Sequence, residues 1–504
     1  MSENAVKLDL NRFSTFQKEL HRRRGKLVDN GGVEMSEGVN TIFKHHFRKI
    51  SWYTPIKERL AASDNQDETI YTASNTYDHL LKTFLDTVLP SLRIKSSYAD
   101  KYRMCWTHNV GINISKGAKL LANDVPLNGF DSIGHDILSQ YGYLTKPGFK
   151  KHHLISIGSV PTLEKWSVVL PAHPINVLQP FYYAKSNHLA LPLLNSSITQ
   201  FKHVYKLRKK ILDLLRMQKY DTKTGNWVDI KPTYSVIEGI KDKDATIPRP
   251  ELWGRYAKIT DEEREWYRDC ALTHEYFYDD LVSCDDTNRK TYGQVAEIPL
   301  VSATPVKAVF WVNENLNATS RHNYSNYTTN ADNAYLGWNP SKMFTLNYST
   351  STRVESMSID HAEREEAWQF PRAPWEPGYN VITFCNDPFS IDGESSVDLN
   401  NHNAKLHITL GNTDPSLITP EDYEPKIDNL DDEVIEEDVE SVTDTDTKNS
   451  KKIPGANVNF MVKCRMLVYR KLTFSFDKSK GGYLFQRDSL DTQQIYFDDK
   501  KAKQ

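Results

Sequence analysis

The sequence predicts an all-β protein built from two antiparallel sandwiches in tandem. Aromatic residues reach 11%, with 26 Tyr and 20 Phe, and such residues favour strands. Short runs in both halves alternate apolar and polar residues with a period of two. The 504 residues also suffice for two large domains at roughly 100–200 residues each. Paired antiparallel sheets are how chains of this kind bury alternating faces.

The first half contains several such runs. Residues 81–89 place apolar and Thr side chains on one face and stop at Pro90. Residues 119–122 and 125–127 flank Asn123-Asp124, which predicts a tight turn between two strands. Further strands are expected at 41–47, 166–170, 201–207 and 251–257. The apolar run 188–194 contains Pro192, which favours an edge or a bent strand there.

Two segments interrupt this rhythm. Residues 208–250 are mixed, charged and rich in Gly, Lys and Pro, and are typical of a long insertion. Residues 261–268 start with an N-cap candidate, Thr260 or Asp261, and carry acids in the first turn. They predict a short helix within a linking segment, 261–282, at the boundary between the two halves.

The second half repeats the strand pattern. Strands are expected at 306–312, 379–385, 404–410 and 458–468, the last continuing at 472–476. Residues 313–336 are rich in Asn, Thr and Tyr without an apolar period, and predict a loop. Residues 428–440 hold eight acids and no base, so 411–453 is expected to be a disordered acidic loop. A calcium loop is disfavoured because no Gly has EF-hand spacing.

The chain ends differ from these halves. In the arm 1–39, Phe13, Phe16 and Leu20 have helical spacing, and the basic run His21–Arg24 precedes a Gly-rich stretch. This predicts a short amphipathic helix that either contacts a membrane surface or internal partner, or is solvated. The first residues have no apolar core of a signal peptide, and no run reaches ~20 apolar residues. A soluble protein made in the cytoplasm is expected.

Charge, cysteines and sequons exclude or weaken several interpretations. A net charge of -3 argues against a protein that wraps nucleic acid, and the basic run 205–210 is short. Five cysteines, an odd number without C-x-x-C spacing, predict reduced thiols packed as small hydrophobes, although a structural disulfide stays open. The N-x-S/T sequons are interpreted as unmodified turns. They begin at Asn113, Asn195, Asn317, Asn323, Asn326 and Asn347.

Catalytic constellations are weak throughout. The pairs His45-His46 and His152-His153 are adjacent, so on a strand they point to opposite faces and cannot chelate one ion. His274-Glu275 does not continue to H-E-x-x-H, and no H-x-H occurs. The densest polar cluster, residues 360–363, is interpreted as a solvated loop. No catalytic, cofactor-binding or metal-binding residues are therefore predicted, and the protein is expected not to be an enzyme.

Five motifs in order resemble the double jelly-roll major capsid proteins of nucleocytoplasmic large DNA viruses. Together they span roughly residues 40–486. They are Thr41–Lys49; Trp166–Leu170 with Asn187–Leu194; Asp261–Arg264 through His274–Phe277; Pro377–Phe384 with Ser395–Asn400; and Tyr469–Phe474 with Gly481–Phe485. The chain departs from the family at 171–176, where a P-F-W-F element is replaced, and in the insertion and the acidic loop.

The resemblance implies two consecutive eight-stranded antiparallel jelly-roll β-sandwiches with long loop insertions. The implied organisation is an arm at 1–39, a first jelly roll at 40–260, a linking helix at 261–282, a second jelly roll at 283–490 and a tail at 491–504. The long loops 313–336 and 411–453 are expected at an exposed end, where insertions cost little.

The implied function is that of a structural protein of the virion capsid, assembled in the host cytoplasm. Homotrimeric capsomers of pseudo-hexagonal outline would tile an icosahedral shell and contact neighbouring capsomers and minor capsid proteins. The arm would reach an internal viral membrane, and no direct nucleic acid binding is expected. The alternatives are a jelly-roll scaffold that shapes the immature virion membrane, and an enzyme or carbohydrate-binding sandwich.

Overall fold

A computed structural model of the chain describes residues 27–28, 34–35, 53–65, 67–144, 161–193, 200–261, 264, 274–349, 351–390, 396–399, 403–411, 459–477 and 482–487. Antiparallel strands dominate these ranges, which confirms the all-β prediction. Within the same ranges, no helix is both long and apolar enough to span a bilayer.

The C-terminal half forms a sandwich of two four-stranded sheets. Their orders are β19-β26-β21-β24 and β20-β25-β22-β23. The eight strands are β19 His274–Ser283, β20 Val295–Leu300, β21 Val306–Asn315, β22 Ser341–Tyr348, β23 Ser351–Ser358, β24 Tyr379–Thr383, β25 Ala404–Leu410 and β26 Phe460–Asp477. Counted along this half, the first strand pairs with the eighth and the second with the seventh, so the chain crosses repeatedly between sheets. That order is a jelly roll. A further strand, β27 Gly482–Arg487, pairs with the end of β26.

The N-terminal half repeats the same order. Its two sheets are β12-β6-β18-β3 and β10-β9-β14-β5, the second extended by β4 at its edge. The strands are β3 Tyr53–Arg59, β4 Ala61–Asn65, β5 Glu68–Thr72, β6 His79–Leu89, β9 Ser115–Ala122, β10 Val125–Asp131, β12 His173–Leu178, β14 Phe201–Leu207 and β18 Glu251–Ile259. With β4 set aside, the pairing again joins first to eighth and second to seventh. Two consecutive jelly rolls are therefore present, as the sequence predicts.

The predicted insertion contains strands of its own. β15 Leu215–Asp221 pairs with β16 Asn226–Ile230 on one side and with β8 Tyr102–Trp106 on the other, and β17 Ile237–Glu238 pairs with β7 Leu92–Ile94. Both β7 and β8 precede the fourth strand of the first roll. β11 Val169–Leu170 joins β7, so the strand expected at 166–170 is shorter than predicted. β13 Leu191–Pro192 lies beside β6 with only two paired residues, and Pro192 thus avoids a long ladder.

Short helices connect the strands. They are α3 Val110–Asn113, α4 Ser132–Gln140, α6 Pro161–Glu164, α8 Leu316–Ser320, the 3₁₀ turns η2 Ser96–Tyr98, η4 Tyr182–Ala184, η5 Asn187–Leu189, η6 Ile211–Leu214, η7 Tyr234–Val236, η8 Ala334–Leu336 and η10 Glu366–Gln369, and the π-type turn η9 His361–Glu365. The turn predicted at Asn123-Asp124 is confirmed: both residues have positive φ, 46° and 68°, as a two-residue hairpin turn with the strand twist requires.

The second roll has an apolar interior between its two sheets. Trp311 and Phe344 pack with ring centroids 5.4 Å apart, and both side chains are almost wholly buried. From β26, the side chains of Val462, Cys464 and Met466 enter this core, which confirms the face predicted from their alternation. Burial of this kind is the main stabilising contribution to a sandwich.

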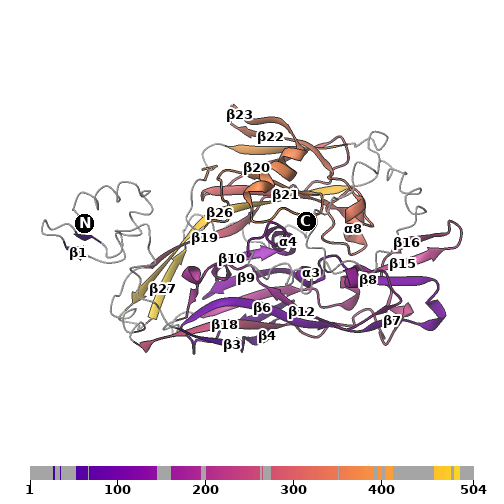
Figure 1. Cartoon of the computed structure of the whole chain (residues 1–504), viewed down its shortest axis with the longest axis horizontal. Helices are drawn as coiled ribbons and strands as arrows, with labels where there is room; N and C mark the ends of the chain where they lie inside the picture. The colour runs from indigo at the N-terminus through magenta and orange to yellow at the C-terminus, as the bar shows by residue number, and fades with distance from the viewer. Residues whose placement is uncertain are drawn as a thin grey trace, which may run out of the picture. The chain divides into compact units, whose positions relative to one another are not determined.

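A second apolar cluster covers the opposite face of the same sheet. Ala308, Phe310 and Val312 of β21 contact Ile137 and Tyr141, which belong to α4 and its C-terminal end in the first roll. Figure 1 shows α4 beside β10, and its residue Leu138 belongs to the same cluster as Leu281 of β19 and Leu467 of β26. The β21 sheet is thus buried on both faces, which explains why residues 306–312 are apolar at nearly every position.

Several predictions differ from the structure or lie outside the described residues. Residues 274–282, expected in the linking helix, form most of β19, because their backbone pairs residue by residue with β26. Asp261 and Arg264 are helical, and residues 265–273 lie outside the described ranges. So do the strand at 41–47, the two His-His pairs, the acidic loop beyond residue 411 and the tail. Of the arm, only the short ladder of β1 Leu27–Val28 with β2 Glu34–Met35 is described.

Candidate functional site

The two jelly rolls meet at an interface of buried charged and polar side chains, which we call the seam. Its first-roll residues lie in 107–113, 128–144, 164 and 185, and those of the second roll in 279–285, 307, 321–335, 376–379 and 465–470. Charged groups are buried in proteins only when paired, because removing them from water is costly. The contacts below show how each is paired.

Asp279 of β19 forms ion pairs with two lysines. Lys185 Nζ of the first roll donates to its Oδ2 at 2.5 Å, and Lys307 Nζ of β21 donates to its Oδ1 at 2.9 Å. Burial acts to raise the pKa of Asp279, but the two ammonium groups outweigh it and hold that pKa below its usual value. Lys307 sits at a register shift of β21, so the strand bulge turns its side chain into the seam.

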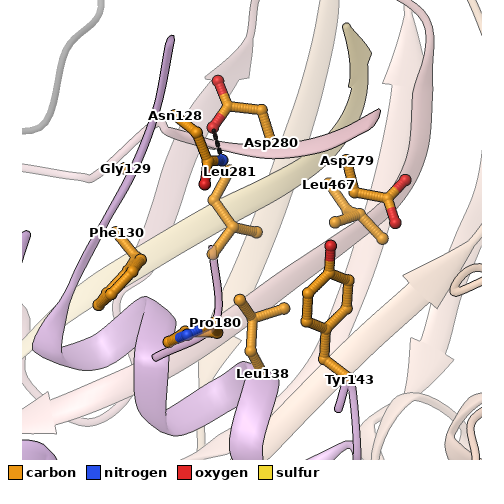
Figure 2. A pocket seen from close by; sticks show the side chains of 10 residues that line it. All are labelled: Asn128, Gly129, Phe130, Leu138, Tyr143, Pro180, Asp279, Asp280, Leu281 and Leu467. Atoms are coloured by element: carbon orange, nitrogen blue, oxygen red, sulfur yellow. Dashed lines mark hydrogen bonds between the residues drawn. The ribbon is translucent and has the colours of Figure 1, made fainter. Parts of the chain in front are cut away.

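Asp280 and Arg470 form the neighbouring contact. Asn128 Nδ2 of β10 donates to Asp280 Oδ1 at 2.8 Å, as Figure 2 shows, and Arg470 Nε lies 3.4 Å from Oδ2. A cavity of about 10 Å³ lies here, lined by residues of both rolls. Because this space holds about one water molecule, the cavity and the paired carboxylates favour a packing gap over a ligand site.

Arg465 of β26 also bridges the two rolls. Its Nη2 and Nε donate to the two oxygens of Asp131, at 2.5 and 3.2 Å, and its Nη1 donates to Asp285. Asp131 also caps α4 by accepting from Gly134 N at 2.8 Å. Burial alone would raise the pKa of Asp131; the guanidinium outweighs this and lowers it. The fork geometry fixes the direction of approach as well as the distance.

His108 and Asp136 form a third group with the second roll. His108 lies 2.6 Å from Glu164 and 2.9 Å from Glu376. Burial opposes a charge on the imidazole, but the two carboxylates outweigh it and raise the pKa of His108 well above its ordinary value. Asp136 accepts from Asn109, and burial raises its pKa to about 6.

The segment 321–335 lies against the first roll, contrary to the expectation of an exposed loop. Tyr327 OH donates to Asp136 Oδ2 at 3.1 Å, and Asn113 Nδ2 donates to Ser325 Oγ at 2.8 Å. The guanidinium of Arg208 lies 4.1 Å from the ring centroid of Tyr324. The Asn- and Tyr-rich composition thus supplies hydrogen bonds and ring contacts to the seam instead of solvent-facing groups.

The Asn residues of the predicted sequons also include several that are buried. Asn113, Asn323 and Asn326 are each about 1% exposed. A glycan on any of them would have to open the packed polar contacts around it, so the folded chain has no room for one at these three positions. Asn195 lies outside the described residues.

The densest polar cluster of the sequence is not a solvated loop. Residues 361–365 form η9, and Glu363 within it accepts from Gly378 N at 3.0 Å and from Asn339 Nδ2 at 3.2 Å. Burial raises the pKa of Glu363. Its role is to hold the segment that leads into β24. No three His, Cys, Asp or Glu side chains among the described residues are arranged to hold a metal ion.

Sequence reasoning missed the seam charges because a strand charge normally faces solvent. A signal was present: Lys307 stands in a run whose two alternating faces are both apolar, so neither face could be solvated. In such a run, a lysine must be buried and paired. The partner, Asp279, could not be identified without the fold.

The chain resembles known proteins in both its sequence and its fold. No protein-family model matches the chain. The major capsid protein of Tipula iridescent virus is 23% identical over 395 residues, covering 71% of this chain and 79% of that protein. The major capsid protein of Rana tigrina ranavirus is 23% identical over 409 residues, covering 74% and 83%.

Solved structures of capsid proteins have a fold similar to that of this chain. PBCV-1 VP54 superposes with a TM-score of 0.61 at 13% identity, covering 89% of this chain and 100% of that one. The Faustovirus major capsid protein has a TM-score of 0.58 at 9% identity, covering 93% and 97%. Together with the two jelly rolls of identical strand order, these similarities show a double jelly-roll fold and a sequence that resembles the major capsid proteins of large DNA viruses.

Proposed function

We propose that three copies of this chain associate about a three-fold axis into a capsomer of pseudo-hexagonal outline, which tiles an icosahedral shell. One observation supports it above the others: two sandwiches of the same strand order are fastened by buried charges along the seam. Because each chain supplies two similar sandwiches, three copies supply six similar units around one axis. A single heterologous contact, repeated three times, closes such a ring.

The seam gives the capsomer its rigidity in this proposal. A shell of identical units needs each unit to keep one shape in every lattice position, and two sandwiches on a flexible tether would not. Bidentate and doubly paired charges, such as Arg465 with Asp131, allow one relative placement and penalise others. The chain is thus a structural component of the virion capsid, and not an enzyme.

Further parts of the proposal concern partners and domain bounds. We place the arm at 1–39, the first roll at 40–260, the second at 274–490 and the tail at 491–504, with the helical link shortened to 261–273. Neighbouring capsomers and minor capsid proteins are the expected contacts, and the arm is the segment suited to an internal membrane. No direct nucleic acid contact is expected from the net charge of -3.

Light scattering after size exclusion tests the capsomer directly. The purified chain should elute with three times the mass of one chain, and electron micrographs should show hexagonal particles with three-fold symmetry. A monomer that stays folded at high concentration would overturn the proposal. Mass spectrometry of purified mature virions should find this chain as a dominant component; its absence there would indicate the scaffold alternative.

A further inference from the structure

Two cysteines of the second roll lie side by side although 180 residues separate them in sequence. β19 ends at Ser283, which pairs with Arg465 of β26, and Cys284 is therefore opposite Cys464. Cys284 N donates to Cys464 O at 3.1 Å, and the two Sγ atoms are 3.2 Å apart. Residues directly opposite on antiparallel strands have Cα atoms ~4.5–5.5 Å apart, within the ~4.4–6.8 Å range of disulfides.

We propose that Cys284 and Cys464 are an oxidation site, at which a small disulfide such as oxidised glutathione converts the two thiols into a cross-strand disulfide. The Sγ atoms have only to approach from 3.2 Å to the ~2.05 Å of the bond, by side-chain rotation on strands that are already paired. The strand ladder continues past the pair, since Asp286 N donates to Val462 O. The backbone therefore does not need to move.

The solvent exposure of the two thiols indicates which of them reacts first. Cys284 is partly exposed, whereas Cys464 is wholly buried in the apolar core, where burial raises the pKa of its thiol well above the usual value. Cys284 is consequently the thiol that meets the oxidant, and its thiolate attacks one sulfur of the small disulfide and releases one small thiolate. The Cys464 sulfur then attacks Cys284 Sγ and gives its proton to the leaving group. A second small thiol departs, so two protein thiols and one small disulfide yield one protein disulfide and two small thiols.

Other described cysteines have no such arrangement. Cys105 is buried in the first roll, where burial raises its pKa to about 12, and Cys385 is buried with the Lys307 carbonyl as its sulfur's acceptor. Oxidation is thus expected at one pair. That pair ties the first strand of the second roll to its last strand, next to the contact of Arg465 with Asp285 and Asp131. A bond there closes a long loop in the unfolded chain and so disfavours unfolding.

The stage of the viral life cycle at which these thiols are oxidised rests on the proposed function. Thiols stay reduced in a host cytoplasm, and disulfides persist in oxidising surroundings. A capsid protein passes from the first to the second when the particle leaves the cell. The pair would then be open during assembly and closed in the released shell.

Oxidised glutathione and peptide mapping test the site on the purified full-length chain. After incubation near pH 8, alkylation and non-reducing digestion, a cross-linked peptide joining Cys284 and Cys464 is expected, with the loss of two titratable thiols. The melting temperature should rise on the order of 5 °C and return with reductant. The Cys284→Ser variant replaces the partly exposed thiol and should show no such rise. Cys105→Ser is the control that should keep the cross-link.

Three results would overturn the proposal. They are a glutathione adduct on Cys284 that never resolves, a cross-link that uses another cysteine, or full thiol titration after oxidant treatment of the folded chain. Light scattering on the reduced protein is scored separately. A cross-linked monomer would contradict only the capsomer, and a trimer without the cross-link would contradict only the oxidation site.

Discussion

The two faces of the sheet β19-β26-β21-β24 are both buried, yet by different chemistry. The face toward β20-β25-β22-β23 is apolar, with Trp311 and Met466 among its contacts. The face toward the first roll mixes apolar residues such as Phe310 with the paired charges Lys307 and Arg465. Apolar contacts stabilise without direction, whereas paired charges tolerate one geometry and penalise the rest. The apolar interior therefore stabilises the second roll, and the charges of the seam fix how the first roll is placed against it.

The largest effect should come from removing the carboxylate that two buried lysines share. Asp279→Ala leaves Lys185 and Lys307 as unpaired buried cations, and should lower the free energy of unfolding by about 3–5 kcal/mol. Chemical denaturation measures this. Glu297→Ala is the control, because its pair with Lys405 is exposed to solvent and screened, so its loss should change stability far less. Equal effects of the two substitutions would contradict a distinct role for the seam.

A triple substitution sharpens the comparison. Replacing Asp279 by Leu and both lysines by Met fills the same space with apolar groups, so the free energy of unfolding should recover most of the loss caused by Asp279→Ala. If the charges specify placement, the recovered protein should form fewer hexagonal particles in electron micrographs. Normal particle formation would show that the apolar contacts of α4 alone set the placement.

Removing side-chain volume from the apolar interior should lower the stability of the second roll. Leu406→Ala removes a fully buried side chain from the interior of the second roll and should lower the free energy of unfolding by about 3 kcal/mol. Val295→Ala, at the start of the adjacent strand β20, is the control because Val295 is 47% exposed and should cost less than ~0.5 kcal/mol. A small effect at Leu406 would mean that the interior is not the stabilising face.

A smaller effect is expected at Gly378, where the seam segment passes β24. Its φ is +98°, and a Cβ there would lie 2.6 Å from the Tyr327 carbonyl oxygen. Gly378→Ala should cost about 1–3 kcal/mol through backbone strain, with the clash in addition. Gly239→Ala separates the two causes, since Gly239 has φ +80° with nothing within 4 Å of the new Cβ. Thermal unfolding of both variants should show the larger loss at Gly378.

Stability should fall as the pH rises toward the folded-state pKa of His108. Because Glu164 and Glu376 raise its folded-state pKa, its contribution is complete below the unfolded pKa of ~6.5 and is lost as pH rises through the folded pKa. The loss should approach ~1.4 kcal/mol per pH unit within that window. Unfolding between pH 6.5 and 9 measures it, and His108→Gln should flatten the profile. A slope retained in that variant would assign the effect to another group.

Asp136 titrates mainly below that pH range in the native chain, although the charge of His108 acts to lower its pKa. Its folded-state pKa of about 6 lies above its unfolded value, so its contribution is lost as pH rises to 6 and is constant above that. Lys185 has a folded-state pKa lowered mainly by burial, so its contribution changes with the opposite sign at alkaline pH. The difference between the native chain and His108→Gln therefore reports the imidazole together with its effect on the titration of Asp136.

The amino-acid sequence by itself determined the strands, because alternation is a local property. Residues 81–89, 201–207 and 404–410 were predicted as strands and lie in β6, β14 and β25. The hairpin at Asn123-Asp124 followed from two residues that tolerate positive φ. The ordered motifs likewise sufficed to predict the two jelly rolls and the resemblance to major capsid proteins.

Only the tertiary structure decided whether the polar face of a strand meets solvent or another domain. A charge on a strand looks the same in sequence whether it meets water or another domain, so the pairing of Lys307 with Asp279 and of Arg465 with Asp131 could not be predicted. Residues 321–335 were misassigned for the same reason, since an Asn- and Tyr-rich segment suits either solvent or a polar interface. The two thiols at positions 284 and 464 became neighbours only because the first and last strands of a jelly roll pair.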